Sequence, residues 1–409
     1  MTVRKLRIAM LSVHSCPVGT LGAKDTGGMS VHIRELAGKL GKQGHTVDIY
    51  TRVHDPKDPQ IVNLGQNARL IHLRAGDEEI DKLAVYTCLP DFVENLESFR
   101  ENDSLQYDLL YSHYWISSLA GKHLQQRWNI PHITTFHTLG AVKNAIGIGE
   151  KEPDLRIESE KEAVRDCQHI IATTEKEKTS LIHYYGASPE NISVVPCGVN
   201  MELFRPVDKE DARRELGSTD DKIILFVGRI EPLKGIATLL RAMPYLQDGH
   251  RPRLVIIGGD KRSQPEIEKL QGLCRELQIE DSVTFLGMIK QDKLPYFYSA
   301  AEVCVIPSYY ESFGLVALES LACGTPVVAT DVGNLKDIIQ PGVTGYVVTE
   351  NTPHSLAEKI DRILCNPQPH TESALSIRAS VHGFSWTNIA EAINRECQLA
   401  VDNYLIPVL

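Results

Sequence analysis

The sequence predicts two doubly wound α/β domains that face each other across a cleft. The chain has 409 residues, more than one hydrophobic core usually serves, so two domains are expected. Short apolar runs alternate with amphipathic helix patterns along both halves of the chain. The apolar runs are nearly continuous, which is typical of parallel strands buried on both faces of a sheet.

The first half opens with a strand, a helix and a second strand. The strand "LRIAMLSV" is followed by a Gly-rich loop from Pro17 to Gly28, the helix pattern "MSVHIRELAGKLGKQG" and the strand "HTVDIYTR". This order implies a right-handed parallel crossover. Further strands are predicted at "YDLLYSH", "PHITTFHT", "CQHIIATT" and "ISVVPCGV". We therefore expect residues 1–198 to form a Rossmann-like domain.

A second, more regular series of strands opens near Lys222. It comprises "KIILFVGR", "RLVIIGG", "SVTFLG", "EVCVIPS", "PVVATD" and "GYVV", separated by helix patterns such as "QPEIEKLQGLCREL" and "SLAEKIDRIL". We expect residues 199–385 to form a second Rossmann-like domain, joined to the first near Gly198 to Pro206. Ligands of such folds bind where the carboxyl ends of the strands open into a crevice. Residues 386–409 form a helix pattern without a following strand, and we expect this helix to cross back to the first domain.

Composition and charge exclude several classes of protein. The net charge is -10, from 43 Lys plus Arg and 53 Asp plus Glu, so no overall attraction to nucleic acid or to an anionic membrane is expected. The nine cysteines form no C-x-x-C pair, and several lie in apolar runs, which favours a reducing compartment. No signal peptide or membrane-spanning run is apparent, so we expect a cytoplasmic protein without membrane insertion. The sequence leaves the oligomeric state open, and a homodimer is compatible with it.

Two motifs are suited to binding a diphosphate. Gly27 and Gly28 follow a strand and open a helix, so bare N–H groups can face an anion there, although a structural turn explains the pair almost as well. The stretch "FVGRIEPLKG" places Arg229 after a strand and Lys234 ahead of a helix that begins near Gly235. The planar guanidinium of Arg229 and the compact ammonium of Lys234 together suit a diphosphate. The alternative is that both residues lie in a solvated surface loop. The chain has neither a Gly-rich dinucleotide fingerprint nor a Walker A motif.

Two carboxylates flank the start of a later helix in "SYYESFGLVALESLACGTPVV". Glu311 follows a predicted strand, and the helix is expected to begin at about Ser312 or Phe313, which leaves free N–H groups in its first turn. Glu319 is the only acidic residue of this helix and lies among apolar neighbours. A buried carboxylate is costly unless it is paired. A ribose diol would supply two donors, and a structural arginine is the alternative.

One histidine is a candidate for contact with a sugar. His137, in "TTFHTLGAVKN", follows an apolar strand and is suited to hydrogen-bonding a sugar hydroxyl or assisting proton movement. A structural role is equally compatible with its position. The other histidines show no metal-ligand spacing, so no metal ion is predicted.

The order of these motifs resembles that of the family 4 glycosyltransferases, which have the GT-B fold. The resemblance covers almost the whole chain, from Gly-Gly after the first strand to the paired glutamates before "GTPVV". It implies a retaining enzyme that transfers a hexose from a nucleotide diphosphate sugar, with UDP-GlcNAc or UDP-glucose favoured. No further cofactor is implied.

The resemblance also implies a donor site. Glu311 would contact hydroxyls of the donor sugar, and Glu319 the ribose of the nucleotide. Arg229 and Lys234 would stabilise the leaving diphosphate, whose phosphates would face Gly28. The loop between the glutamates would bind the donor through Ser312, Phe313, Gly314 and Leu315. The residues implied in catalysis are Arg229, Lys234, His137 and Glu311.

The first half is most similar to inositol-phosphate N-acetylglucosaminyltransferases, in "SVHSCP", "DTGGMSVH", "SHYWISS", "HTLGAVKN", "EPDLR" and "VDIYTR". This similarity implies that the phosphate of a small phosphorylated acceptor is held by Lys82, Tyr114, Thr138 and Arg156. It also implies that His14 and the loop from Asp25 to Ser30 line the polyol. The chain departs from the family at Ser30, where the family has Asn, and around Lys82, where the match is weak. Fructose 6-phosphate as the acceptor, a lipid acceptor at the membrane surface, and a non-catalytic sugar-nucleotide sensor are the alternatives.

Overall fold

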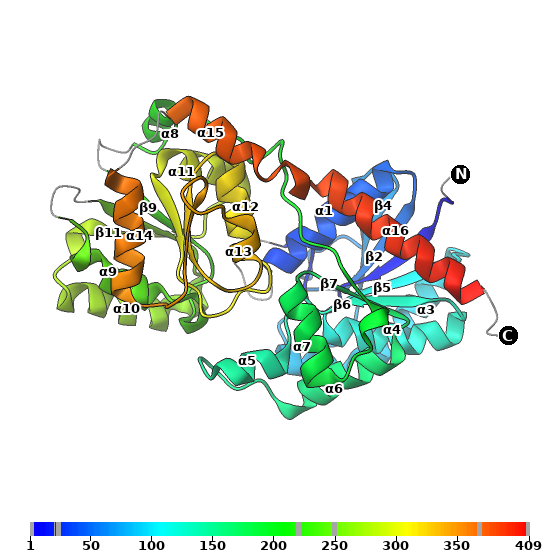
Figure 1. Cartoon of the computed structure of the whole chain (residues 1–409). Coiled ribbons are helices and arrows are strands. Elements are labelled where there is room, and N and C mark those ends of the chain that lie inside the picture. Colours follow the sequence, from blue (N-terminus) through cyan, green and yellow to red (C-terminus); the bar gives the residue numbers. More distant parts are fainter. Residues whose placement is uncertain are drawn as a thin grey trace.

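The computed structural model describes residues 4–19, 21, 26–217, 222–247, 252–365 and 370–405. Figure 1 shows two α/β units side by side, each built around one sheet with helices packed against it. Both sheets are doubly wound, because the strand order reverses direction at β1 in the first and at β9 in the second. The fold class predicted from the sequence is therefore confirmed.

The first sheet has the order β3-β4-β2-β1-β5-β6-β7-β8 and is parallel except for β3, which runs antiparallel to β4. Its strands are β1 (Arg7–Leu11), β2 (Thr46–Arg52), β3 (Ile61–Gly65), β4 (Ala68–Leu73), β5 (Leu109–His113), β6 (His132–Thr135), β7 (His169–Ala172) and β8 (Ile192–Val194). Six of these were predicted. The β3–β4 hairpin was not, although the apolar run "ARLIHL" of β4 is a strand signal.

Alternate residues of the strands face opposite sides of this sheet. Ile8 and Met10 belong to the buried cluster that includes α1, whereas Ala9 and Leu11 belong to the cluster under α3 and α4. Both faces are thus covered, as the continuous apolar runs require. The helices of the first half are α1 (Gly28–Lys42), α2 (Lys82–Thr87), α3 (Leu89–Asn102), α4 (Trp115–Trp128), α5 (Gly140–Ile146), α6 (Asp154–Asp166) and α7 (Glu175–Tyr185).

The second sheet is entirely parallel, with the order β11-β10-β9-β12-β13-β14. Its strands are β9 (Ile223–Val227), β10 (Arg253–Ile257), β11 (Val283–Gly287), β12 (Val303–Ile306), β13 (Val327–Thr330) and β14 (Gly345–Val348). All six were predicted. The helices are α8 (Lys209–Glu215), α9 (Ile236–Ala242), α10 (Gln264–Glu276), α11 (Leu294–Ala300), α12 (Leu315–Ala322), α13 (Leu335–Ile338), α14 (Pro353–Cys365) and α15 (His370–Ala379).

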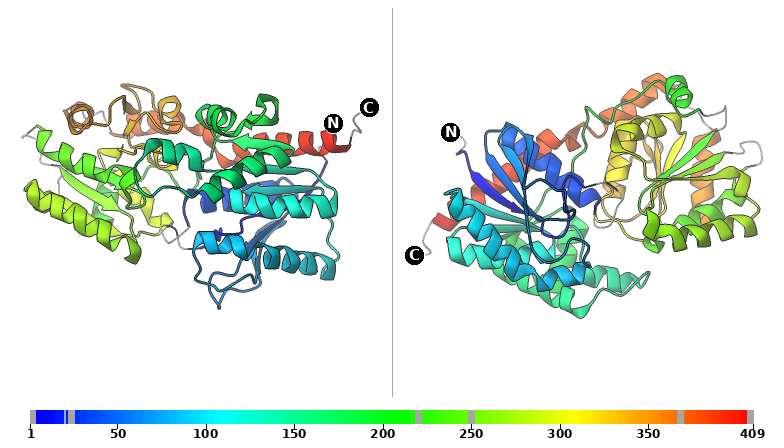
Figure 2. Two further views of the ribbon diagram at one scale, coloured as in Figure 1. Left: turned by 90° about the horizontal axis from the view of Figure 1, so that it is seen from below. Right: turned by 180° about the vertical axis from the view of Figure 1, so that it is seen from behind.

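The chain crosses between the two units twice. The last helix, α16 (Trp386–Leu405), leaves the second unit and packs beside α1 of the first (Figures 1 and 2). At the crossing Val199 pairs with Ser385, and a Cβ atom on Gly198 would lie 2.6 Å from the Trp386 ring. Only glycine lets the two crossings approach this closely. We propose this double crossing as the domain boundary, which the sequence analysis places at residues 198 and 385.

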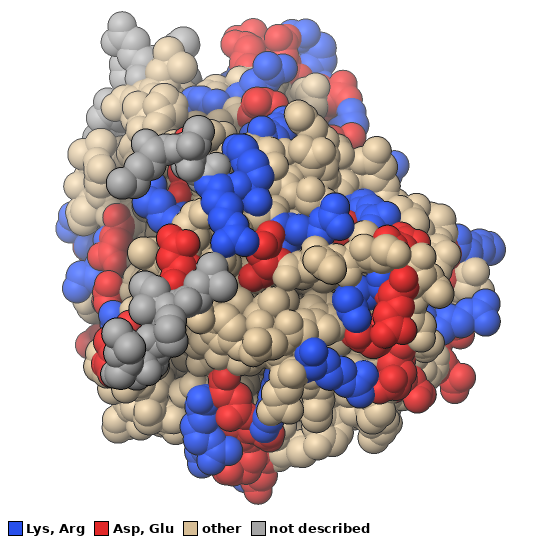
Figure 3. Space-filling view, turned by 90° about the vertical axis from the view of Figure 1, so that its right-hand side faces the viewer, with Lys and Arg blue, Asp and Glu red and all other residues tan. Residues whose placement is uncertain are grey.

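The surface charge is mixed. Figure 3 shows basic and acidic side chains interspersed over the described part of one face of the molecule. Among the described helices, none combines the length and the apolar character that a membrane crossing needs.

Candidate functional site

The candidate site lies where the first turn of α1 approaches the first turn of α12 across the two units. A Cβ atom on Gly28 would lie 3.0 Å from Leu315 Cδ1, whereas one on Gly27 would meet nothing within 4 Å. A side chain at position 28 would therefore press on the second unit.

Lys234 and Glu311 are brought together by the ends of two neighbouring strands. Lys234 is the last residue of the 3-10 helix Pro232–Lys234 after β9, and its Nζ lies 2.7 Å from Glu311 Oε1 after β12. The Ser308 hydroxyl donates to the same oxygen at 2.8 Å. A Cβ atom on Gly235 would lie 1.9 Å from the Pro307 carbonyl oxygen, so this close approach of the two loops requires glycine.

Arg229 lies further out. Its side chain is 58% exposed, and its Nη2 lies 3.0 Å from Glu231 Oε1. Among the described residues, no recorded ion pair joins Arg229 to Glu311, the partner of Lys234. An exposed ion pair of this kind contributes about 0–1 kcal/mol, so Arg229 can leave Glu231 at little cost.

The helix after Glu311 begins later than predicted. Helix α12 starts at Leu315, and Ser312 to Gly314 form a bend, because Gly314 has the left-handed backbone angle φ 111°. The expectation of a start at Ser312 or Phe313 was wrong for this reason. Within the described part of the chain, the N–H groups of Phe313, Gly314 and Leu315 donate to no recorded acceptor. These amides line the bend in front of α12 and are available to a ligand.

Glu319 is held by a tyrosine and a glutamine. The Tyr298 hydroxyl, from α11, donates to Glu319 Oε2 at 2.8 Å. Burial raises the pKa of Glu319 to about 7, and the hydrogen bonds from Tyr298 and Gln291 lower it by less. The recorded ion pairs of the described residues include none to Glu319, so no structural arginine accounts for this carboxylate.

The raised pKa of Glu319 implies that the stability of the protein depends on pH. Between pH 4.5, the ordinary pKa of a glutamate, and about pH 7, the Glu319 carboxyl keeps its proton in the folded protein but loses it in the unfolded chain. The free energy of unfolding therefore falls as pH rises through that range. The loss is on the order of 3 kcal/mol at pH 8. Glu319→Gln removes the charge, and we expect the unliganded variant to be the more stable protein at pH 8 and no more stable at pH 4.5. Urea unfolding of both proteins at the two pH values tests this.

The control for that measurement is Glu276→Gln, which changes an exposed residue at the end of α10. It should unfold like the unaltered protein at both pH values. A stability difference for Glu319→Gln that does not change with pH would contradict the prediction.

Five of the six described acceptor residues, all except Ser30, form one cluster beside the first sheet. The Tyr114 ring lies 5.4 Å from Lys82 Nζ, 4.9 Å from Arg156 Cζ, and 4.4 Å from the His14 ring centre. Arg156 Nη2 also donates to Thr138 Oγ1 and to the Thr138 carbonyl oxygen, each at 2.9 Å. Burial, with the nearby Lys82, lowers the pKa of His14 well below its usual range, so its imidazole is neutral. Two cations, two hydroxyls and a neutral imidazole thus converge.

Arg156 is also held by ion pairs with two glutamates. Its side chain is 2% exposed, its Nη1 lies 2.9 Å from Glu152 Oε2, and its Nε lies 2.7 Å from Glu160 Oε1. Glu160 accepts a hydrogen bond from the Gly140 N–H at 3.0 Å as well. The guanidinium is therefore held in one orientation, with Nη2 directed to Thr138.

Two residues at the ends of β5 and β6 adopt strained backbone conformations. Tyr114 has φ 76° and His137 has φ 62°, a region that non-glycine residues rarely occupy. Each costs of order 1–3 kcal/mol, and such residues cluster at functional sites. His137 Nε2 lies 2.9 Å from His113 Nδ1, and the ring of His32 is 5.1 Å from that of His137.

Sequence reasoning missed two members of this histidine group. Burial lowers the pKa values of His32, His113 and His137, so all three are neutral. The signal that identified His137 could also have identified His113, which is a polar residue at the carboxyl end of an apolar strand, in "YSHYWISS". In the described residues no group of three or more His, Cys, Asp or Glu is arranged to hold a metal ion.

The loop before α1 is described only in part. Asp25 lies outside the described residues, so the structure does not place it. Ser30 is fully buried, and its hydroxyl lies 2.8 Å from that of Ser15 and accepts a hydrogen bond from the Gly27 N–H at 3.4 Å. The Ser30 side chain thus holds the first turn of α1 to the loop after β1.

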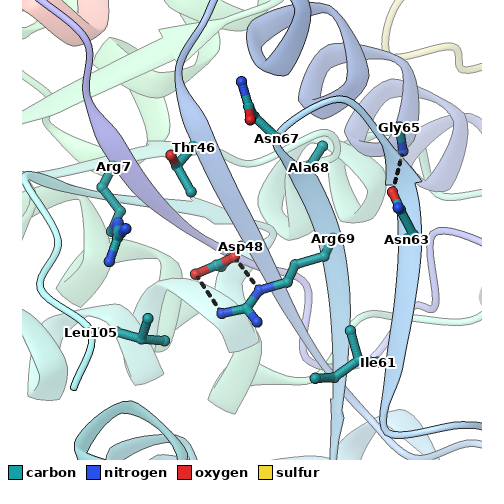
Figure 4. Close-up of a pocket in the computed structure, with 10 residues that line it drawn as sticks. All are labelled: Arg7, Thr46, Asp48, Ile61, Asn63, Gly65, Asn67, Ala68, Arg69 and Leu105. Carbon is teal, nitrogen blue, oxygen red and sulfur yellow. Dashed lines mark hydrogen bonds and ion pairs between the residues drawn. The ribbon is translucent and has the colours of Figure 1, made fainter. Parts of the chain in front are cut away.

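A pocket of about 390 Å³ lies away from the candidate site, at the amino ends of β1 and β2 (Figure 4). Arg69 Nε pairs with Asp48 Oδ1 at 2.7 Å, and the Tyr107 hydroxyl donates to Asp48 Oδ2 at 2.7 Å. No predicted site residue lines this pocket. Amino and carboxyl ends of parallel strands lie at opposite edges of a sheet, so the pocket is separate from the candidate site.

Two doubly wound units with a Lys–Glu pair before α12 and a cationic cluster opposite it define a GT-B glycosyltransferase. Residues 26–203 match the family model described as Glycosyltransferase Family 4, and residues 208–379 match that described as Glycosyl transferases group 1. The chain belongs to the family 4 glycosyltransferases, as its motifs predicted.

Curated relatives match almost the full length of the chain. The D-inositol 3-phosphate glycosyltransferase of Corynebacterium glutamicum is 35% identical over 97% of this chain and 98% of its own. That of Acidothermus cellulolyticus is 38% identical over 95% of this chain and 89% of its own. Among solved structures, a sucrose-phosphate synthase from Thermosynechococcus elongatus is 34% identical, with a TM-score of 0.89, covering 98% of this chain and 100% of that one.

Proposed function

We propose that this enzyme is a retaining glycosyltransferase that transfers a hexose from a nucleotide diphosphate sugar to a small phosphorylated polyol such as inositol phosphate. The observation that carries the proposal is the cluster of Lys82, Tyr114, Thr138 and Arg156. Ammonium, guanidinium and hydroxyl groups together suit the charge and the acceptor oxygens of a phosphate dianion. The names of the full-length relatives support an inositol phosphate acceptor.

On the acceptor side, the phosphate would bind beside the anchored Arg156, to Lys82 and to the Thr138 hydroxyl, which accepts from Arg156 and can still donate its own proton. The neutral His14 beside Tyr114 would hydrogen-bond the polyol. Ser30 and Asp25 are assigned to the polyol side by family resemblance. For Ser30 this means an effect on the loop geometry, because its own hydroxyl is engaged by Ser15.

On the donor side, the diphosphate would draw Lys234 from Glu311 and Arg229 from Glu231. The free amides of Phe313, Gly314 and Leu315 would complete its shell, with Ser312 in the same bend, and Gly28 would approach from α1. Glu311, released from Lys234, would accept hydrogen bonds from hydroxyls of the donor sugar. Glu319 would bind the ribose diol. UDP-GlcNAc or UDP-glucose is the favoured donor.

The transfer would then need no protein nucleophile. The bond between the sugar C1 and the diphosphate oxygen breaks, and the bond from C1 to the acceptor oxygen forms on the same face of the ring. The acceptor proton passes to the departing phosphate oxygen. Arg229, Lys234 and the amides before α12 stabilise the charge that develops on the diphosphate, while both sites orient the reactants. The neutral His137 is suited to hydrogen-bond a sugar hydroxyl.

A second acceptor, fructose 6-phosphate, is favoured by one specific observation. The sucrose-phosphate synthase of Thermosynechococcus elongatus is about as similar in sequence as the inositol-phosphate enzymes, and its structure superimposes over nearly the whole chain. Both acceptors are hydroxylated rings that carry one phosphate. The same cationic cluster would serve either of them.

The test is release of the nucleotide diphosphate from UDP-GlcNAc, UDP-glucose, ADP-glucose or GDP-mannose. Each donor is paired with inositol 3-phosphate, fructose 6-phosphate, free inositol, free fructose or no acceptor. We expect release to require one phosphorylated acceptor and to be lost with its phosphate-free form. Equal release with inositol or fructose lacking phosphate would contradict the role of the Lys82 cluster. Binding of nucleotide without release for any pair would contradict the proposed transfer.

A further inference from the structure

Two helices of the first domain make polar side-chain contacts with the second domain. Arg34, on α1, donates from its Nη2 to Gln291 Oε1 at 2.9 Å. Lys176, on α7, has its Nζ 2.5 Å from Asp331 Oδ1, and it also donates to the Asp331 carbonyl oxygen at 3.3 Å. Lys176 belongs to the first domain and Asp331 follows β13 of the second, so separating the domains breaks this ion pair.

Asp331 has a second cation nearby, which comes from its own domain. Lys336, on α13, has its Nζ 3.9 Å from Asp331 Oδ2, and its side chain is 71% exposed. Replacing Lys176 would therefore leave a positive charge beside the Asp331 carboxylate. What the replacement removes is the link between the two domains.

The loop that begins at Asp331 packs against the bend in front of α12. The Asn334 N–H donates to the Phe313 carbonyl oxygen at 2.9 Å. A Cβ atom on Gly333 would lie 2.8 Å from that oxygen and 3.0 Å from the Glu311 carbonyl oxygen, so this contact requires glycine. The bend whose amides are assigned to the donor diphosphate thus rests on a loop whose first residue is bound from the other domain.

We propose that Lys176 is a positioning residue, whose ion pair with Asp331 holds the two domains together and steadies the bend in front of α12 for the donor. The inference rests on the assignment of that bend to the donor in the proposed function. A donor that binds only when the domains are docked loses affinity in proportion to the fraction of molecules that are undocked. An exposed ion pair is weak, but its free energy is enough to change the ratio of docked to undocked molecules up to about fivefold.

The test compares Lys176→Ala and Lys176→Glu with the unaltered enzyme. The readouts are X-ray scattering without ligand, UDP binding by calorimetry, and the KM values of donor and acceptor. Lys176→Ala is expected to weaken UDP binding and raise the donor KM about two- to fivefold, with a smaller change in the acceptor KM. Lys176→Glu places two carboxylates opposite each other, so it should weaken UDP binding further and enlarge the radius of gyration.

Lys336→Ala is the matched control, because it removes a cation beside the same carboxylate and leaves the link between the domains intact. It should leave every readout unchanged. The exchanged pair, Lys176→Glu with Asp331→Lys, restores opposite charges across the interface and should recover most of the affinity lost in Lys176→Glu. Because salt screens an exposed pair, the difference between Lys176→Ala and the unaltered enzyme should shrink at about 0.5 M salt.

The proposal is overturned if Lys176→Ala matches Lys336→Ala in UDP binding and donor KM, or if the exchanged pair is no better than Lys176→Glu. A larger radius of gyration in Lys176→Glu without weaker UDP binding also overturns it, because the ion pair would then hold the domains without affecting the donor site.

UDP binding to the unaltered enzyme separates this inference from the proposed function. If the unaltered enzyme does not bind UDP or the other nucleotide diphosphates of the four donors, the donor assignment fails and the inference fails with it. If UDP binds and the Lys176 variants behave like Lys336→Ala, only the inference fails.

Discussion

Lys234→Ala is expected to lower turnover about 10²- to 10³-fold, the loss typical of removing one preorganised donor from developing negative charge. Lys234 Nζ is half-buried and lies 2.7 Å from Glu311 Oε1, and it is the cation that the diphosphate would draw from this carboxylate. Since charge builds on the diphosphate as its bond to the sugar breaks, most of the loss should appear in kcat rather than in the donor KM. Steady-state release of the nucleotide diphosphate measures both constants.

The matched control for Lys234 is Lys269→Ala. Lys269 lies on α10 of the same domain, is 74% exposed, and has its one recorded ion pair within the described part of the chain with Glu266, one turn away. It should retain full turnover. Lys234→Arg keeps the charge and should fall between the two. A folded Lys234→Ala enzyme whose kcat stays within threefold of the original would remove Lys234 from the diphosphate site.

Arg156→Ala is expected to destabilise the protein by about 3–5 kcal/mol, because it leaves the buried Glu160 carboxylate without its cation, whereas Glu152 keeps its ion pair with Lys143. Glu160 is fully buried and Glu152 is 18% exposed, and both lie within 3 Å of the guanidinium at 2.7 and 2.9 Å. Urea unfolding at neutral pH measures the free energy of unfolding directly. The same substitution removes the Nη2 that donates to Thr138, so a folded sample should also show a raised acceptor KM.

A second substitution separates the effect of the unpaired Glu160 charge from the effect of the packing lost with the Arg156 side chain. Arg156→Ala with Glu160→Gln should recover part of the lost stability, since an amide carries no charge but still accepts the Gly140 hydrogen bond. Arg127→Ala, at an exposed pair with Glu94, should leave the free energy of unfolding nearly unchanged. If Arg156→Ala unfolds within 1 kcal/mol of the unaltered protein, the buried ion pairs are not the anchor that their burial indicates.

Much of the fold followed from local sequence pattern. The strands that are buried on both faces are near-continuous apolar runs, so β1, β2 and β5 to β14 were predicted from the sequence. The β3–β4 hairpin was not, because β3 alternates exposed and half-buried residues at the sheet edge and has no continuous apolar run. The start of α12 was misplaced because the helix pattern does not show that Gly314 takes a left-handed conformation.

The sequence by itself determined the fold class and the family, and it predicted most residues of the candidate site, because strand ends and helix starts carry those residues at set spacings. Only the tertiary structure decided which of them touch: Lys234 pairs with Glu311 while Arg229 stays on Glu231, and the Tyr114 ring is near both Lys82 and Arg156. It also revealed partners with no motif of their own, such as Arg34 and Gln291. These contacts join residues up to 257 positions apart, and their geometry depends on how the two domains pack rather than on any local pattern.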